Sequence, residues 1–272
     1  MMERLNIAPE EYFARPEISN SMMKDFRDKG PWTFYHTHIK RNIQPAEPSN
    51  SMRIGSAFHL VMADFDVFSE SAVVTPVSIM GEPVNLRKKA HREWMSEFRD
   101  VNHGKILLSP EEMDMVLRMK ESVYENPAAV KNIFDLTVDR NEVVGIKEIE
   151  GVSCKAMCDA DFSDRGLIVD FKTTRQHLGV QFAKDAIYKY GYQFQAAHYC
   201  DVFDAERFVF IVVRNFPPYE TLVFEIPQEM MGQARMINYQ TLERINWCQA
   251  HNDWHSDGWG QVINLEDMVN NE

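Results

Sequence analysis

Apolar residues follow two different spacings in the two halves of the chain. Up to about residue 135 they recur every three to four positions, which is typical of amphipathic helices. Farther along they gather in short, nearly continuous runs that are typical of buried strands. The first half therefore predicts a short strand over 72–79 and helices over 19–41 (interrupted at Gly30-Pro31), 52–68, 85–101 and 109–126.

The second half begins with three predicted strands joined by tight turns. Their sequences are EVVGIKEI, VSCKAMCDAD and LIVDFKT, and the last is apolar enough for the centre of a sheet. A long helix over 179–202, the strands ERFVFIVVRN and ETLVFEIP, and a helix over 227–250 follow. This order predicts an α/β (α+β) fold with a central mixed β-sheet flanked by helices and a helical N-terminal region.

Length and composition fit one domain with a sizeable core, since 44% of the 272 residues are hydrophobic and 26% are charged. We expect a single domain over 1–272, with a helical part to about 135, a sheet core over about 136–226 and a C-terminal helix and tail over 227–272. No apolar run approaches the ~18 residues of a membrane helix, and the start, MMERLNIAPEEYF, lacks the layout of a signal peptide. We therefore expect a cytoplasmic protein without a membrane partner, whose four cysteines are buried free thiols.

The net charge of −12 disfavours a protein that coats nucleic acid broadly, because phosphate contacts need lysine and arginine. It does not exclude an enzyme that acts on nucleic acid. A carboxylate-rich site binds Mg²⁺, and the metal then supplies positive charge where a phosphate must lie.

Charged residues interrupt the apolar strands of the predicted sheet. Asp170 and Lys172 lie two apart on LIVDFKT, so both side chains face one side of the sheet and Phe171 faces the other. Asp159 ends the preceding strand, and a hairpin would bring it close to Asp170. Two such carboxylates, with the Phe171 carbonyl, can hold one or two Mg²⁺ ions for phosphodiester hydrolysis, while Lys172 orients or deprotonates water or stabilises developing charge. The spacing alone leaves open a buried Asp–Lys ion pair that serves the fold.

The run CDAD…LIVDFKTT followed by YGYQFQAAHY resembles the PDDEXK nuclease superfamily, and within it the RecE-type (exonuclease VIII-like), RecB-like branch. That branch carries a G-x-x-x-H helix, an aspartate, a D-x-K strand and a Q-x-x-x-Y helix. This chain has each part in order: Gly55 to His59, Asp159, Asp170 to Lys172, and Gln195 to Tyr199. The likeness spans roughly residues 15–265 and implies a restriction-endonuclease-like core. Asp170 stands where many members carry glutamate.

The resemblance assigns metal binding to Asp159, Asp170 and the carbonyl of Phe171, and catalysis to both acids together with Lys172. It also implies that His59 is a metal ligand. For His59 alone, a packed core histidine is the alternative.

Gln195 and Tyr199 lie one helical turn apart and so share a face. The resemblance implies that both reach the site and contact phosphate or Lys172; the alternative is a polar patch on a packed helix. Glu142 precedes the first strand and is a candidate ligand for a second metal, or else a solvated strand start.

Contacts to DNA must come from other side chains. Thr173 and Thr174 either bind phosphate or simply favour strand geometry. The densest basic run is a candidate for phosphate contacts, although each member also fits a solvated helix face. Its members are Arg87, Lys88, Lys89 and Arg92.

The resemblance implies a Mg²⁺-dependent exodeoxyribonuclease that holds one or two ions, with Mn²⁺ as a substitute. Iron–sulfur nucleases of the RecB-like branch use one cysteine before the core and three near the C-terminus. Here Cys154 is the first cysteine and Cys248 the only one in the C-terminal region, so we expect no iron–sulfur cluster.

The family further implies 5′→3′ degradation of double-stranded DNA from an end, which leaves 3′ single strands for recombination in a bacterial or phage-infected cell. It implies a ring-like homo-oligomer, such as a tetramer, and a single-strand annealing partner of RecT type. The alternatives are a PDDEXK nuclease of other polarity, an endonuclease, a catalytically inactive DNA-end-binding module, or a structural interaction protein with a fortuitous D-x-K.

Overall fold

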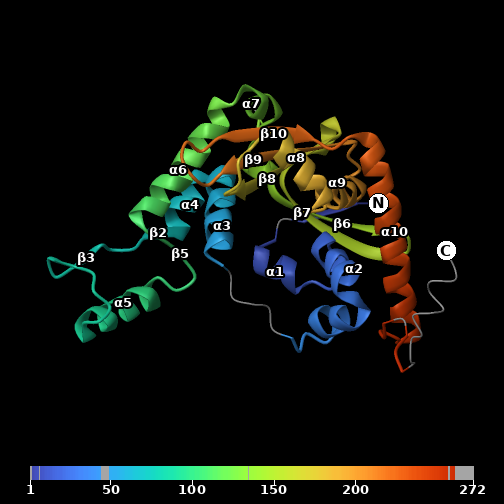
Figure 1. Ribbon diagram of the computed structural model, residues 1–272, viewed down its shortest axis with the longest axis horizontal. Helices are drawn as coiled ribbons and strands as arrows, with labels where there is room; N and C mark the ends of the chain where they lie inside the picture. Colours follow the sequence, from blue (N-terminus) through green and yellow to red (C-terminus); the bar gives the residue numbers. More distant parts are fainter. Residues whose placement is uncertain (1, 6, 44–48, 134, 257, 261–272) are drawn as a thin grey trace.

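The computed structural model describes residues 2–5, 7–43, 49–133, 135–256 and 258–260. Within these residues one six-stranded sheet runs in the order β1-β6-β7-β8-β9-β10 (Figure 1). Neighbouring strands are antiparallel except β8 and β9, which are parallel, so the predicted mixed sheet is confirmed. The strands are β1 (Glu3–Leu5), β6 (Asn141–Ile149), β7 (Val152–Phe162), β8 (Leu167–Thr174), β9 (Arg207–Arg214) and β10 (Thr221–Glu225).

Helices cover both faces of this sheet (Figure 1). One face packs against α3 and α6, and the other against α2, α8, α9 and α10, which buries the apolar side chains of the central strands on both sides. The helices are α1 (Pro9–Ala14), α2 (Asn20–Phe34), α3 (Asn50–Ala63), α4 (Phe65–Ser71), α5 (Lys89–Val101), α6 (Pro110–Glu125), α7 (Pro127–Ile133), α8 (Val180–Tyr188), α9 (Tyr192–Phe203) and α10 (Gln228–His251), with a π-helical turn at Tyr35–Ile39 and 3₁₀ turns at Val138–Arg140 and Ser163–Arg165.

Strands β7 and β8 separate at Asp159 and Asp170. Their ladder joins only Ala160–Phe162 to Leu167–Val169; away from it, β7 pairs with β6 and β8 pairs with β9. We call this opening the fork. On the β7 side it is filled by Ile18, whose N–H donates to Ser153 O and whose carbonyl accepts from Lys155 N, both at 2.9 Å. The fold thus places two acids where the central sheet divides.

The side chains of β7 change faces at the fork. Cys154, Ala156 and Cys158 pack in the layer of α9, whereas Ala160 and Phe162 pack in the layer of α3. Regular alternation would have kept all five on one face. The residue between the two runs is Asp159, so this acid lies at the switch between the helical layers.

Two predicted helices are wrong in their extent. The long helix expected over 179–202 is divided into α8 and α9, because Gly191 takes a left-handed conformation (φ 71°) between them. The helix expected over 52–68 ends at Ala63, and the Asp64 carboxylate then caps the separate helix α4. The helix over 109–126 is confirmed as α6, with the predicted capping box formed by Ser109 and Glu112.

A projecting arm interrupts the helical half of the chain (Figure 1). It lies between β2 (Ala72–Val74) and β5 (Ile106–Leu108), which pair in parallel, and it holds α5. A two-residue pairing of β3 (Ser78–Ile79) with β4 (Glu82–Pro83) precedes that helix. The region predicted as helical therefore also contributes strands, including β1 of the main sheet.

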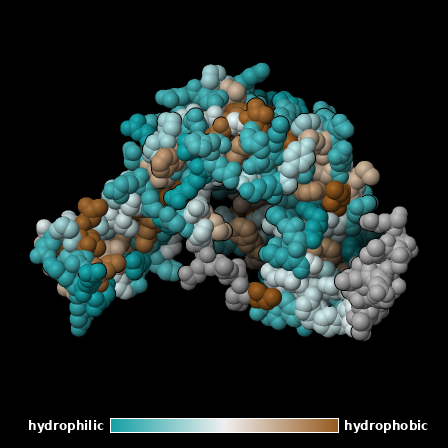
Figure 2. Space-filling model, viewed as in Figure 1, coloured by the Kyte–Doolittle hydropathy of each residue, from teal (hydrophilic) through white to brown (hydrophobic). Residues whose placement is uncertain are grey.

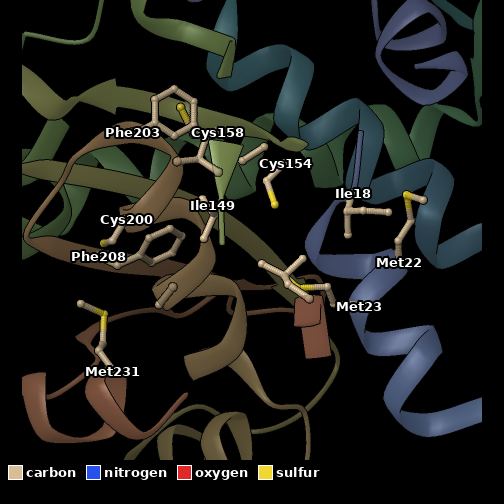
Figure 3. Packing of buried hydrophobic residues seen from close by; sticks show 14 of the residues in the cluster. Ile18, Met22, Met23, Ile149, Cys154, Cys158, Cys200, Phe203, Phe208 and Met231 are labelled. Atoms are coloured by element: carbon tan, nitrogen blue, oxygen red, sulfur yellow. The ribbon is translucent and has the colours of Figure 1, made fainter. Parts of the chain in front are cut away.

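All four cysteines are buried thiols outside any disulfide, as predicted. Figure 3 shows Cys154, Cys158 and Cys200 in the core beside Ile149 and Phe208, in the layer between the sheet and α9. None of the helices in the described ranges is long and apolar enough to cross a membrane.

Candidate active site

The two acids at the fork are joined through the backbone. Asp159 Oδ2 accepts a hydrogen bond of 2.6 Å from the N–H of Phe171, the residue that follows Asp170. Phe171 itself turns toward α3, where its ring meets that of Phe58 edge to face at 6.1 Å. The predicted arrangement, with Asp170 and Lys172 on one face and Phe171 on the other, is therefore present.

Helix α3 brings His59 to the first acid. The His59 Nδ1 lies 3.0 Å from Asp159 Oδ1, so both oxygens of Asp159 have a hydrogen-bond partner. Burial acts to lower the pKa of His59, but the charge and hydrogen bond of Asp159 outweigh it and raise this pKa. Burial likewise acts to raise the pKa of Asp159, yet His59, Lys172 and the Phe171 N–H lower it below its ordinary value. The pair therefore favours a charged carboxylate.

The start of the G-x-x-x-H segment explains how α3 approaches β8. A side chain at Gly55 would begin 3.7 Å from the hydroxyl oxygen of Thr173, so the glycine faces this threonine directly. Thr173 thus faces α3, while Thr174 accepts a 3.2 Å hydrogen bond from the backbone of Gln176. Neither contact requires a ligand.

Helix α9 supplies the contact to the second acid. Gln195 Nε2 donates to Asp170 Oδ1 at 2.5 Å, and the Lys172 ammonium lies 2.5 Å from Asp170 Oδ2. Asp170 is only 3% exposed, and burial raises its pKa to about 6 against the opposing charge of Lys172. Burial acts to lower the pKa of Lys172, but Asp170 and Asp159 outweigh it, so the pKa is raised and the amine stays protonated near neutral pH.

Glu142 lies opposite Asp159 on β6. The ladder pairs Asn141 with Ala160 and Val143 with Cys158, and Glu142 stands between them with a positive φ of 49°. Burial and then the charge of Asp159 raise the pKa of Glu142. A row of three acids on β6, β7 and β8 therefore crosses the fork.

The other residue of the Q-x-x-x-Y pattern, Tyr199, lies near enough to Asp170 and Asp159 that burial and also their charges raise its pKa, but it forms no hydrogen bond with them among the described residues. The Tyr199 ring packs edge to face on Phe208 at 5.7 Å, against the core, and burial raises its pKa far above the ordinary value. Tyr192 is the tyrosine near Lys172, with 6.0 Å between the ammonium and the ring centroid. Tyr192 was not predicted from the sequence; its signal was the spacing of three from Gln195, which places both on one face of α9.

The basic run lies on the arm, away from the fork (Figure 1). All four side chains are exposed; Lys88 pairs with Glu82 and Lys89 with Glu93. Arg92 donates to the carbonyls of Leu86 and Arg87. The arm is therefore a basic region that is separate from the acidic fork. Figure 2 shows a hollow between α3 and α1.

The donor groups at the fork fit a hard divalent cation, because most are carboxylate or carbonyl oxygens. Across the described residues, no three histidine, cysteine, aspartate or glutamate side chains already form a metal-binding group. Asp170 Oδ2 is nevertheless buried and, within the same residues, contacts only the Lys172 ammonium, so a cation held here would share this oxygen with Lys172. The Phe171 carbonyl points to the same side of the strand as its N–H, into the fork.

His59 also fits a site of this kind. Its Nδ1 lies 3.0 Å from Asp159 Oδ1, so an ion held by both residues would take the place of this hydrogen bond.

The sheet, its two helical layers and the acids at the fork define a PDDEXK-like α/β domain. The chain belongs to the family described as PDDEXK-like domain of unknown function (DUF3799), which matches residues 19–259. The superfamily resemblance inferred from the motifs is thereby confirmed. A comparison with curated proteins gives no match.

One solved structure shows the same fold. A protein from Eubacterium rectale, described as a putative exonuclease, is 14% identical with a TM-score of 0.60, over 98% of this chain and 100% of that chain. A phage-related exonuclease from Haemophilus somnus 129PT is also 14% identical, but its TM-score is 0.29 over 58% of this chain and 85% of that chain. The first of these supports the architecture of the whole chain.

Proposed function

We propose that this protein is a Mg²⁺-dependent deoxyribonuclease whose site is the fork. The observation that carries the proposal is the convergence of Asp159, Asp170 and Lys172, which takes place between strands that part at these residues. A buried ion pair that served only the fold would not need further contacts from two helices. Here His59 of α3 contacts Asp159 Oδ1 and Gln195 of α9 contacts Asp170 Oδ1. The family membership and the described name of the Eubacterium rectale protein support the same class of activity.

Asp159, Asp170, the Phe171 carbonyl and His59 are the proposed ligands, with Glu142 as a candidate for a second ion. A bound Mg²⁺ would supply Lewis-acid chemistry and an activated water for phosphodiester hydrolysis. Mn²⁺ is the expected substitute.

The protein's own side chains orient the Asp170 carboxylate and stabilise negative charge on the phosphate. Gln195 holds Asp170 through one oxygen, which fixes the plane of the carboxylate. Lys172 remains a cation because both acids raise its pKa, so it stabilises negative charge on the phosphate rather than accepting a proton from water. Tyr199 packs on Phe208 in the core and would help to position α9.

The finer proposal follows the RecE-type resemblance: 5′→3′ degradation of double-stranded DNA ends that leaves 3′ tails for recombination. It includes a homo-oligomeric ring, such as a tetramer, an annealing partner of RecT type, and the cytoplasm of a bacterial or phage-infected cell. The exposed run on the arm and the threonines after Lys172 are the proposed contacts to duplex phosphates.

The test is incubation of the purified protein with linear duplex labelled at the 5′ or the 3′ ends, with Mg²⁺ or with EDTA. We expect Mg²⁺-dependent release of nucleotides from the 5′ ends first. Release from the 3′ ends first would show that degradation runs in the 3′→5′ direction. Equal cutting of closed circular DNA would show that the protein is an endonuclease. Binding to DNA ends without cleavage in Mg²⁺ or Mn²⁺ would overturn the enzymatic proposal in favour of a DNA-end-binding module.

A further inference from the structure

Arg214 ends β9 beside the strand that carries the candidate site. It pairs with Thr174 in the parallel ladder of β8 and β9. The next backbone N–H, that of Asn215, donates to the Thr174 carbonyl at 2.8 Å, so the two strand ends are held together. The position of Arg214 relative to β8 is therefore fixed by main-chain hydrogen bonds.

Arg214 lies on the same face of the sheet as Asp170 and Lys172. In the ladder, Asp170 pairs with Phe210 and Lys172 pairs with Val212, and both partners pack in the layer of α9. Continuing by two residues gives Thr174 and Arg214, about 7 Å farther along the strands at ~3.3 Å per residue. A long arginine side chain can span much of that interval, so Lys172 on β8 and Arg214 on the neighbouring β9 follow one another on the same face of the sheet.

The charge of Arg214 has no protein partner among the described residues. No carboxylate there lies within ion-pair distance, and its Nε is buried without a hydrogen-bond acceptor. The guanidinium carbon lies 5.2 Å from the Phe216 ring, which holds the group in place without neutralising it. At the other end of the same strand, Arg207 donates to both oxygens of Glu225, at 2.9 and 2.8 Å.

An arginine that is half-buried and unpaired is costly, and this chain has 41 acidic residues from which a partner could have come. The anion that completes it therefore comes from outside the chain. The planar guanidinium matches phosphate oxygens in a two-point contact, and its location next to Lys172 points to the same polyanion.

We propose that Arg214 binds a backbone phosphate of the nucleic-acid strand in the fork, next to the phosphate held at Lys172. The proposal rests on the proposed function and adds to it a second phosphate subsite at the carboxyl end of β8 and β9. Arg214 belongs to substrate binding, and Phe216 is the residue that positions it.

The experiment compares Arg214→Met with the matched variant Arg207→Met. The probe is a fluorescent 20-base-pair duplex, whose binding is followed by anisotropy in Ca²⁺ over a series of salt concentrations. One phosphate contact contributes about one unit to the slope of log affinity against log salt. We expect Arg214→Met to weaken binding about tenfold and to lower that slope by about 0.9. Arg207→Met should leave both unchanged.

Two further variants keep the test decisive. Arg214→Gln keeps a polar side chain without charge and should lose the same slope; it is used if Arg214→Met lowers the melting temperature. Arg214→Lys should keep the slope but bind more weakly, since it loses the two-point contact. An unchanged slope in the folded Met or Gln variant, or an equal loss in Arg207→Met, would overturn the proposal.

The two proposals fail separately. Cleavage of DNA with a normal salt slope in Arg214→Met or Arg214→Gln would remove the phosphate subsite and keep the nuclease. DNA binding with the expected slope change but no cleavage would remove the nuclease and keep the subsite.

Discussion

Asp159 accepts a hydrogen bond from the backbone N–H of Phe171 across the fork. Phe171 stands between Asp170 and Lys172, so this one bond fixes the first acid to the strand that carries the other two groups. The geometry of the site thus depends on a main-chain group, which no substitution at Phe171 other than proline removes.

The contribution of that bond can be measured with two variants at Asp159. Both Asp159→Ala and Asp159→Asn remove the charge, but only the asparagine retains an oxygen to accept from Phe171. We expect the alanine variant to have a free energy of unfolding about 1–3 kcal/mol lower than the asparagine variant. Urea denaturation near neutral pH provides the measurement, and equal stabilities would show that the bond has no structural weight.

Replacement of Lys172 tests the electrostatic role of the amine. Lys172→Met keeps the length of the side chain and removes the cation 2.5 Å from Asp170. We expect kcat to fall by about 10²–10⁴ in protein that is folded at the assay temperature. The exposed Lys131 on α7 is the control, as Lys131→Met should behave like the wild type. Full activity in Lys172→Met would mean that the site is elsewhere.

Gln195 is expected to affect metal binding through Asp170. Gln195→Ala leaves Asp170 Oδ1 without its donor, so the carboxylate loses one of the two groups that orient it. Outer contacts of this kind are worth about 10–100-fold in metal affinity. The Mn²⁺ concentration for half-maximal activity should therefore rise by that factor, whereas Gln249→Ala on the exposed face of α10 should leave it unchanged. The idea fails if both variants respond alike.

Buried His198 predicts a loss of stability in mild acid. The side chain is 1% exposed, its Nε2 lies 3.0 Å from the Lys155 carbonyl, and burial lowers its pKa to about 4. Between about pH 6.5 and pH 4 the unfolded chain binds a proton that the folded chain excludes. The free energy of unfolding therefore decreases as the pH is lowered through this range. Between pH 7.5 and 5, wild-type protein should lose about 2 kcal/mol more than His198→Gln. Parallel stability curves would contradict this assignment.

Two glycines predict opposite effects of the same substitution. A Cβ at Gly145 on β6 would lie 2.9 Å from atoms of Val202 and Phe203 in α9, so Gly145→Ala should destabilise by about 1–3 kcal/mol. At Gly232 on α10 nothing lies within 4 Å, and Gly232→Ala should stabilise by about 0.4–1 kcal/mol. Thermal melting of the two variants distinguishes them directly, and a shared direction would refute the close approach of α9 to β6.

The alternation of a single strand was sufficient to place Asp170, Phe171 and Lys172 on their correct faces, because that geometry is local. The same holds for the capping box of α6, which depends on two residues three positions apart. The break at Gly191 also has a local signal, because glycine readily adopts the left-handed conformation that ends a helix. It was not predicted because the helical spacing of apolar residues continues across it.

The fork itself could not be predicted from local pattern. It exists because β7 leaves β8 for a different neighbour, and because Ile18, from a distant part of the chain, pairs with β7 in its place. Arg214 escaped notice for the same reason: its meaning depends on pairing with Thr174 across a crossover that contains α8 and α9. Contacts between distant segments decide both features.

Ile18 protects an otherwise bare edge. Without that short segment, the peptide groups of Ser153 and Lys155 would face outward unpaired, in the middle of a strand rich in apolar residues. Exposed edges of this kind recruit strands from other molecules. A version of the protein that begins at α2 should therefore aggregate before any loss of activity can be measured. The segment before that helix governs solubility as well as shape.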